Sequence, residues 1–174
     1  MRVASGIMKT VMRFALTCSV AAGLLVGTAG ASAPVRRYDD PRHRFHFSFP
    51  GDCASARGAA NQSDVVSCNN GTAYVIFAPG GTDQPALQRL VNHIIGDWGG
   101  MMLIRNDRRA KLDHRPARSM FAVGTRPDRE VANIQIVATA KDGGWYALVC
   151  QSSTWEGDSR SYFLTILQSL HFEG

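Results

Sequence analysis

The chain has 174 residues, of which 45% are hydrophobic and 19% charged, so it is long enough for one globular domain with a buried core. Its formal net charge of +5 becomes +2 over residues 32–174, because Arg2, Lys9 and Arg13 lie in the N-terminal segment. A nucleic-acid-binding domain is usually more basic, so the composition argues against nucleic acid as a partner.

The N-terminal segment has the pattern of an export signal. Lys9 and Arg13 precede an apolar run over about 14–26, and small residues follow it. The run is about 13 residues long, whereas a bilayer-spanning helix needs roughly 20. We therefore predict a cleaved signal peptide over residues 1–31, a periplasmic or secreted protein, and no membrane span in the mature form.

Two cleavage points and two start positions compete in this segment. Cleavage after Ala33 would leave proline as the first residue, which is a poor substrate, so we predict cleavage after Ala31. Met8 is an alternative start that gives a more compact signal. A lipid anchor on Cys18 is disfavoured, because the threonine before it replaces the small residue expected there.

The first elements of the mature chain are short strands. Residues 32–43 are interpreted as a polar leader, and a single domain is predicted over 44–174. Phenylalanines alternate with polar residues over 44–49, which is the period of a half-buried strand. Two further strands, with an Asn-Gly hairpin turn between them, are predicted at 65–68 and 72–78.

An amphipathic helix is predicted over 84–98, because its apolar residues recur at helical spacing. Thr82 or Asp83 would cap its N-terminus, Pro85 suits its first turn, and Gly99-Gly100 would end it.

The rest of the chain has strand signals followed by a second helix. Residues 131–141 alternate between apolar and polar, and Asp142-Gly143 predicts a hairpin to the apolar run 144–151. The remaining predictions are strands at 101–104 and 119–123, a helix that begins at Asp158 or Ser159 and carries Tyr162, Phe163, Ile166, Leu167 and Leu170, and a short strand at Phe172. The predicted class is α+β, a mainly antiparallel sheet with two amphipathic helices packed on it as an α/β/α-type sandwich.

Three cysteines remain after signal cleavage, and an exported protein meets an oxidising compartment where cysteines pair. We predict a disulfide between Cys53 and Cys68, which flank a loop-like segment, and a free Cys150 buried in an apolar strand. A Cys68–Cys150 bridge is the alternative.

Motifs at both ends of the domain resemble those of a known family. The chain opens with Tyr38-Asp39-Asp40-Pro41 and Phe45-His46-Phe47-Ser48-Phe49-Pro50, and closes with Ile166-Leu167-Gln168-Ser169-Leu170-His171-Phe172. These segments resemble the Y-x-x-P, F-x-F-x-x-P and I-L-x-S-[FL]-x-F motifs of the PsbP/Mog-like superfamily, over nearly all of residues 38–172. The resemblance implies an α/β/α sandwich and a non-enzymatic binding or assembly role. The signal and the cysteine pair fit a bacterial envelope member.

No residue pattern indicates catalysis or metal binding. The chain has no G-x-S-x-G nucleophile elbow, and no histidine lies close to Cys150 in sequence. His43 and His46 would lie on opposite faces of a strand. Gly80-Gly81-Thr82 lacks the lysine of a phosphate-binding loop. We therefore assign no catalytic residue, metal ligand or cofactor, and favour a protein without enzymatic activity.

A basic stretch is the sharpest functional signal. Over residues 105–118 the cations outnumber the anions. The anions are Asp107 and Asp113, and the cations are Arg105, Arg108, Arg109, Lys111, Arg115 and Arg118. Because arginine binds carboxylate and phosphate bidentately, the stretch predicts a docking surface for an unidentified acidic protein or anionic envelope component. The alternative is a solvated loop or edge strand whose charges prevent aggregation.

The sequence therefore predicts an exported, non-catalytic binding or assembly module that docks to another macromolecule. The alternative is an immunity or inhibitor protein that neutralises an extracytoplasmic toxin or hydrolase.

Overall fold

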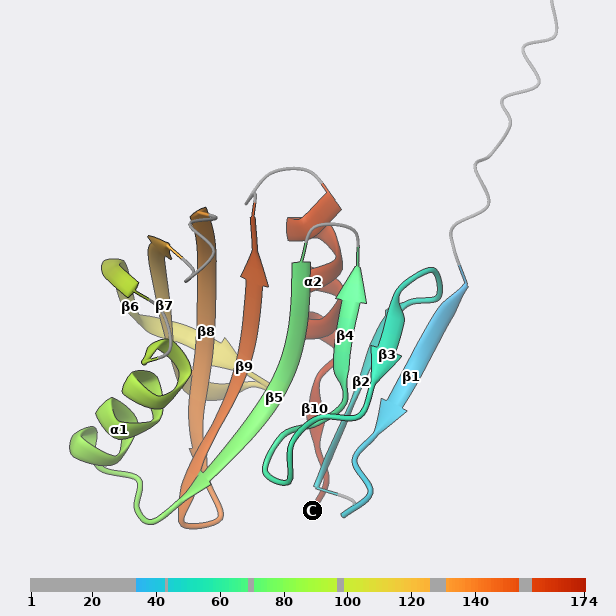
Figure 1. Cartoon of the computed structure of the whole chain (residues 1–174). Coiled ribbons are helices and arrows are strands. Elements are labelled where there is room, and N and C mark those ends of the chain that lie inside the picture. The colour runs from blue at the N-terminus through green and yellow to red at the C-terminus, as the bar shows by residue number, and fades with distance from the viewer. Residues whose placement is uncertain (1–33, 43, 69–70, 97–98, 126–130, 154–157) are drawn as a thin grey trace, which may run out of the picture. The chain divides into compact units, whose positions relative to one another are not determined.

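A large antiparallel sheet separates two layers in the computed structural model (Figure 1). The structure describes residues 34–42, 44–68, 71–96, 99–125, 131–153 and 158–174, with only the backbone at 99–105 and 158–159. The elements are β1 (Val35–Asp39), β2 (Phe45–Pro50), β3 (Ala54–Ala56), β4 (Val65–Cys68), β5 (Gly71–Pro79), α1 (Gln84–Ile95), β6 (Gly99–Leu112), β7 (Arg115–Thr125), β8 (Val131–Lys141), β9 (Gly144–Ser152), α2 (Asp158–Ser169) and β10 (His171–Phe172).

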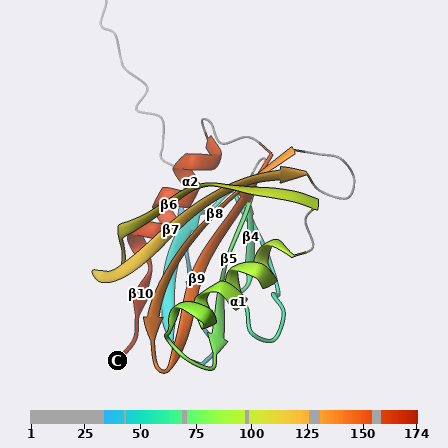
Figure 2. The ribbon, with the colours of Figure 1, turned by 90° about the vertical axis from the view of Figure 1, so that its left-hand side faces the viewer.

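Within these residues the seven-stranded sheet has the order β3-β4-β5-β9-β8-β7-β6, and a smaller sheet has the order β1-β2-β10. Helix α1 covers one face of the large sheet, while α2 and the small sheet cover the other (Figure 2). This arrangement confirms the predicted α+β class. No helix among the described residues is long and apolar enough to cross a membrane.

Strand β9 lies at the centre of the large sheet and is buried on both faces. Its alternate side chains enter the two cores, with Tyr146, Leu148 and Cys150 toward α2 and Trp145, Ala147 and Val149 toward α1. A strand that is buried on both faces needs apolar residues at successive positions. This is why 144–150 is a continuous apolar run rather than an alternating one.

Strand β2 supplies the aromatic part of the core on the α2 side. Phe45, Phe47 and Phe49 are buried, as their alternation predicted, and Tyr38 of β1 stacks on Phe47 with ring centroids 5.0 Å apart. Buried residues of α2 complete this core, namely Tyr162, Phe163, Ile166 and Leu170.

Helix α1 begins directly after Asp83, one of the two capping residues that the sequence predicted. The Asp83 side chain accepts a hydrogen bond of 2.8 Å from the backbone N–H of Ala86, and Pro85 lies in the first turn. The apolar stripe over Leu87, Leu90, Val91 and Ile94 is buried. The helix ends at Ile95, and positions 97–98 of the prediction lie outside the described residues.

Two strands lie where the sequence indicated none. The expected leader at 32–43 contains β1, which pairs antiparallel with β2, and the expected loop between Cys53 and Cys68 contains β3. All three residues of β3 are exposed, and in β1 only Tyr38 is partly buried. Edge strands with so few buried side chains have no period-two hydrophobic pattern, so the sequence contained no signal for them.

The basic stretch forms a hairpin rather than a loop. Strand β6 extends through it to Leu112 and pairs with β7, with Asp113 and His114 in the turn at φ values of 48° and 62°. Two left-handed residues are what a tight hairpin turn requires. Strand β6 is the edge strand of the described sheet, and its register shifts before Arg105 and between Asp107 and Ala110.

Cys53 and Cys68 form a disulfide, and Cys150 is a free, buried thiol. The Cys150 Sγ lies 3.4 Å from the Tyr162 hydroxyl oxygen, and burial raises the pKa of the thiol to about 11. Cys150 therefore stays protonated at neutral pH and is a poor nucleophile.

Removal of the disulfide by paired Cys53→Ser and Cys68→Ser substitutions is expected to lower the free energy of unfolding by about 3 kcal/mol, because the bond restricts the unfolded chain. Urea unfolding with and without reductant measures the loss. Cys150→Ser is the control for reductant sensitivity, since it retains the bond. An unfolding midpoint that does not respond to reductant would contradict the pairing.

Candidate functional site

Three of the six predicted cations line one groove at the β6–β7 hairpin. This groove, here called the arginine groove, has a volume of about 430 Å³ and is lined by Arg108, Arg115, Pro116, Ala117, Arg118, Thr139, Ala140 and Trp145. Arg109 and Lys111 are exposed outside this lining, and the side chain of Arg105 is not among those described. The geometry of the two strands therefore brings only three of the six cations into the groove.

Both carboxylates of the basic stretch are engaged elsewhere. Asp107 accepts a 2.8 Å hydrogen bond from the backbone N–H of Arg109, and its side chain lines a different groove. Asp113 accepts a 3.0 Å bond from the backbone N–H of Phe172, and its other oxygen lies 2.7 Å from His171 Nδ1. The anions that balance the segment in sequence therefore do not enter the arginine groove.

The groove arginines have no counter-charge in the described part of the chain. No side-chain hydrogen bond or ion pair between described residues engages the guanidinium groups of Arg108, Arg115 and Arg118, and no carboxylate contributes to the described lining. Elsewhere, by contrast, Arg37 pairs with Asp39 and Lys141 with Asp142. The groove therefore presents positive charge that the described residues leave unneutralised.

One wall of the groove is apolar and fixed in position. The Trp145 ring is only 8% exposed, and its Nε1 donates a 3.3 Å hydrogen bond to the Asp83 carbonyl oxygen. The Thr139 hydroxyl donates a 2.9 Å bond to the Pro116 carbonyl oxygen. A cleft with charges of one sign and low-dielectric walls concentrates the electrostatic field, so an anion is attracted more strongly here than on an open surface.

A second groove, of about 450 Å³, lies between α2 and strands β6–β8, and its charges are mixed. Asp107 and Arg160 both line it, together with Ala110, Ser119, Phe121, Gln135, Phe163 and Leu164. The Gln135 amide donates a 3.2 Å hydrogen bond to the Ser119 hydroxyl. Because one lining charge offsets the other, this groove does not select for an anion.

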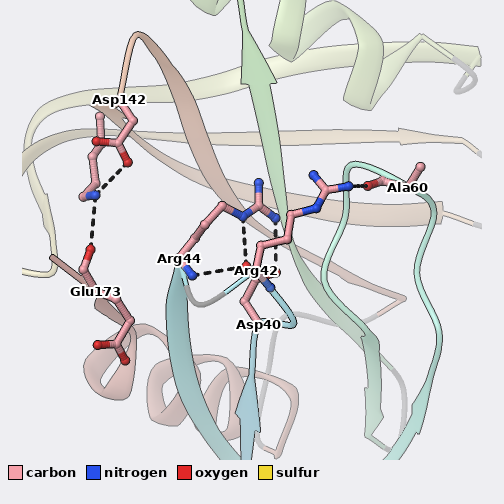
Figure 3. Close-up of polar contacts among 7 residues, drawn as sticks. Asp40, Arg42, Arg44, Ala60, Asp142 and Glu173 are labelled. Atoms are coloured by element: carbon pink, nitrogen blue, oxygen red, sulfur yellow. Dashed lines mark hydrogen bonds and ion pairs between the residues drawn. The ribbon is translucent and has the colours of Figure 1, made fainter.

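A buried ion pair holds the connection between β1 and β2 (Figure 3). Asp40 accepts bonds of 2.9 and 3.1 Å from the Arg44 guanidinium, which lies over the rings of Phe45, Phe77 and Tyr146. Burial alone would raise the pKa of Asp40, but the hydrogen bonds from Arg44 outweigh it and hold the pKa below its usual value. The bond to Asp40 in turn raises the pKa of Arg44. Both groups stay charged at neutral pH, so the pair has a structural role.

Two histidine–carboxylate contacts hold the C-terminal strand in place. His46 Nδ1 lies 2.7 Å from Glu173 Oε1, and His171 Nδ1 makes the contact with Asp113 described above. Both histidines lie beside the core phenylalanines, and their rings are 5.5 Å apart. Within the described ranges, no three His, Cys, Asp or Glu side chains are placed to hold one metal ion. Sequence reasoning missed these contacts because each joins distant segments.

No protein-family model matches the sequence, and no curated protein matches it either. Similar folds are found among solved structures. Cyanobacterial PsbP (CyanoP) from Synechocystis sp. PCC 6803 superimposes with a TM-score of 0.57 at 17% identity, over 84% of this chain and 96% of that one. A Bacteroides thetaiotaomicron VPI-5482 structure gives 0.55 at 9% identity, over 80% of this chain and 48% of that one.

LpqN of Mycobacterium tuberculosis, whose structure is described as that of a protein involved in cell envelope biogenesis, gives a lower TM-score of 0.49 at 11% identity. This match covers 80% of this chain and 92% of that one. At such identities the superpositions above 0.5 show a shared architecture and not a shared activity. The layer order and the match to CyanoP agree with the resemblance in sequence, and the chain has a PsbP-like fold.

Proposed function

We propose that this chain is an exported, non-catalytic module that docks to an anionic partner macromolecule through the arginine groove. The observation that carries the proposal is the set of three arginines in one groove, without a counter-charge among the described residues. Arginine forks bind carboxylates and phosphates with charge-assisted hydrogen bonds, which are stronger than neutral ones. A partner that supplies the missing anions therefore gains both attraction and orientation.

The proposed location outside the cytoplasm rests on two features of the chain. The predicted signal over 1–31 directs export, and the Cys53–Cys68 disulfide suits an oxidising compartment. N-terminal sequencing of the exported protein tests the location. A first residue of Ser32 would support it, whereas full-length protein retained in the cytoplasm would contradict it.

The docking proposal is tested by salt elution from two immobilised polymers, poly-L-glutamate and polyphosphate. A triple variant with Arg108, Arg115 and Arg118 replaced by alanine is expected to elute at clearly lower salt than the parent, because its anion contacts are lost. A second triple variant, Arg37→Ala, Arg57→Ala and Arg89→Ala, removes the same charge from outside the groove. It should elute close to the parent. Equal losses in both variants would show that only net charge matters and would refute the proposal.

A further inference from the structure

The chemistry of the arginine groove narrows the class of its ligand. We infer that the groove takes a phosphoryl group carried on a small, hydrophilic sugar or polyol unit. The inference rests on the proposed function, since it names the anion for the same site.

Hydrogen-bond donors far outnumber free acceptors in the groove. Arg108, Arg115 and Arg118 each present a planar fork of N–H donors, whereas Thr139 offers a single hydroxyl oxygen, which donates its proton to Pro116 and keeps only its acceptor capacity. A carboxylate has two oxygens and one charge, which suffice for a single fork. A phosphoryl group has three terminal oxygens and a charge approaching −2 at neutral pH, so it can bond to more than one guanidinium.

The size and the apolar wall of the groove indicate more than a bare ion. A volume of about 430 Å³ lies in the range of roughly 300–1,000 Å³ that is usual for small-molecule sites. Pro116, Ala140 and the anchored Trp145 offer a carbon surface beside the arginines. The C–H faces of a sugar or polyol can lie against this wall while the phosphoryl group meets the guanidinium groups.

The rim of the groove favours a water-exposed carrier over a bilayer. Among the described residues, the large hydrophobic side chains that remain exposed are Val35, Val131 and Leu164, and none of them lines the arginine groove. A membrane-facing surface combines cations with apolar side chains that enter the interface. The groove has its cations without such side chains, so the ligand is a soluble or polymer-borne phosphate rather than a lipid headgroup in a membrane.

A matched pair of sugars tests the inference by titration of the full chain. Glucose 6-phosphate and glucuronate share a pyranose ring and differ in the anion. We expect saturable binding of glucose 6-phosphate with an affinity about tenfold higher than that of glucuronate. The Arg118→Lys variant keeps the charge but loses the fork, so it should weaken the phosphate complex about fivefold or more. Arg57→Ala, an exposed arginine outside the groove, should leave it unchanged.

The outcomes separate this inference from the proposed function. If glucuronate binds as tightly as glucose 6-phosphate while the arginine triple variant still loses polymer binding, the phosphoryl inference is wrong and docking stands. If the chain binds phosphatidylglycerol vesicles but not glucose 6-phosphate, the inference that the phosphoryl group is carried on a hydrophilic sugar or polyol is wrong. If neither sugar binds and the polymers do not distinguish the two triple variants, both proposals fail.

Discussion

Replacement of Asp40 by alanine is expected to lower the free energy of unfolding by about 3–5 kcal/mol. The carboxylate is only 3% exposed and accepts four hydrogen bonds, two from the Arg44 guanidinium and two from the backbone N–H groups of Arg42 and Arg44. Alanine would leave the Arg44 charge among aromatic rings without a counter-ion. Urea unfolding followed by circular dichroism measures the change.

Asp39→Ala is the matched control, because its ion pair with Arg37 is of similar length, 2.7 Å, but both side chains are more than half exposed. Exposed pairs contribute about 0–1 kcal/mol, so this variant should lose little. Similar losses for the two variants would contradict a structural role for the buried pair.

The Asp40 pair also predicts how stability responds to acid. The folded-state pKa of Asp40 lies below the ordinary value of 3.8, so between the two values the unfolded state binds more protons. The contribution is complete above the ordinary value and is lost as the pH falls through the folded-state value. The Asp40→Ala variant should therefore show a flatter decline of stability below about pH 4.

Replacement of Phe47 by alanine is expected to cost about 3–5 kcal/mol. Phe47 is fully buried in the middle of β2, with ring centroids 5.0 Å from Tyr38, 6.4 Å from Phe45 and 6.2 Å from Phe49. The neighbouring rings belong to β1 and β2, and β2 pairs with β1 on one side and with β10 on the other, so the cavity cannot collapse readily.

The same urea experiment on Val35→Ala supplies a control, since Val35 is 66% exposed in β1 and should lose about 0.5 kcal/mol or less. A loss below about 1.5 kcal/mol for Phe47→Ala would mean that the core relaxes around the deletion and that β2 is not the rigid centre of this layer.

The sequence predicted the elements whose side chains alternate between two environments. Strands β2 and β8 and helix α1 each have one clear period, because each has a buried face or stripe. Strands β1 and β3 lie at sheet edges with almost no buried side chain, and β6 beyond the predicted strand at 101–104 has charged residues along the sheet edge. Backbone pairing with a neighbour forms these strands, and such pairing leaves no pattern in the local sequence.

The sequence predicted the basic composition of the candidate site but not the arrangement of its side chains in space. The excess of cations over 105–118 is visible in the sequence, but which of them lack a counter-charge depends on distant contacts. Asp113 is engaged by His171 and Phe172, which lie near the C-terminus and reach it only through the pairing of β10 with β2. The Asp40–Arg44 pair was missed because its segment was interpreted as a leader.

The central claim is that anions dock in the arginine groove, and an NMR titration of the isotope-labelled chain tests it most directly. On addition of polyphosphate, we predict saturable shifts of the side-chain N–H signals of Arg108, Arg115 and Arg118 and of the backbone amide of Trp145, since these four residues line the groove. Signals of Arg160 and of the α2 amides should stay in place. Shifts centred on α2 and Arg160, or a linear drift spread over the whole surface, would contradict the account.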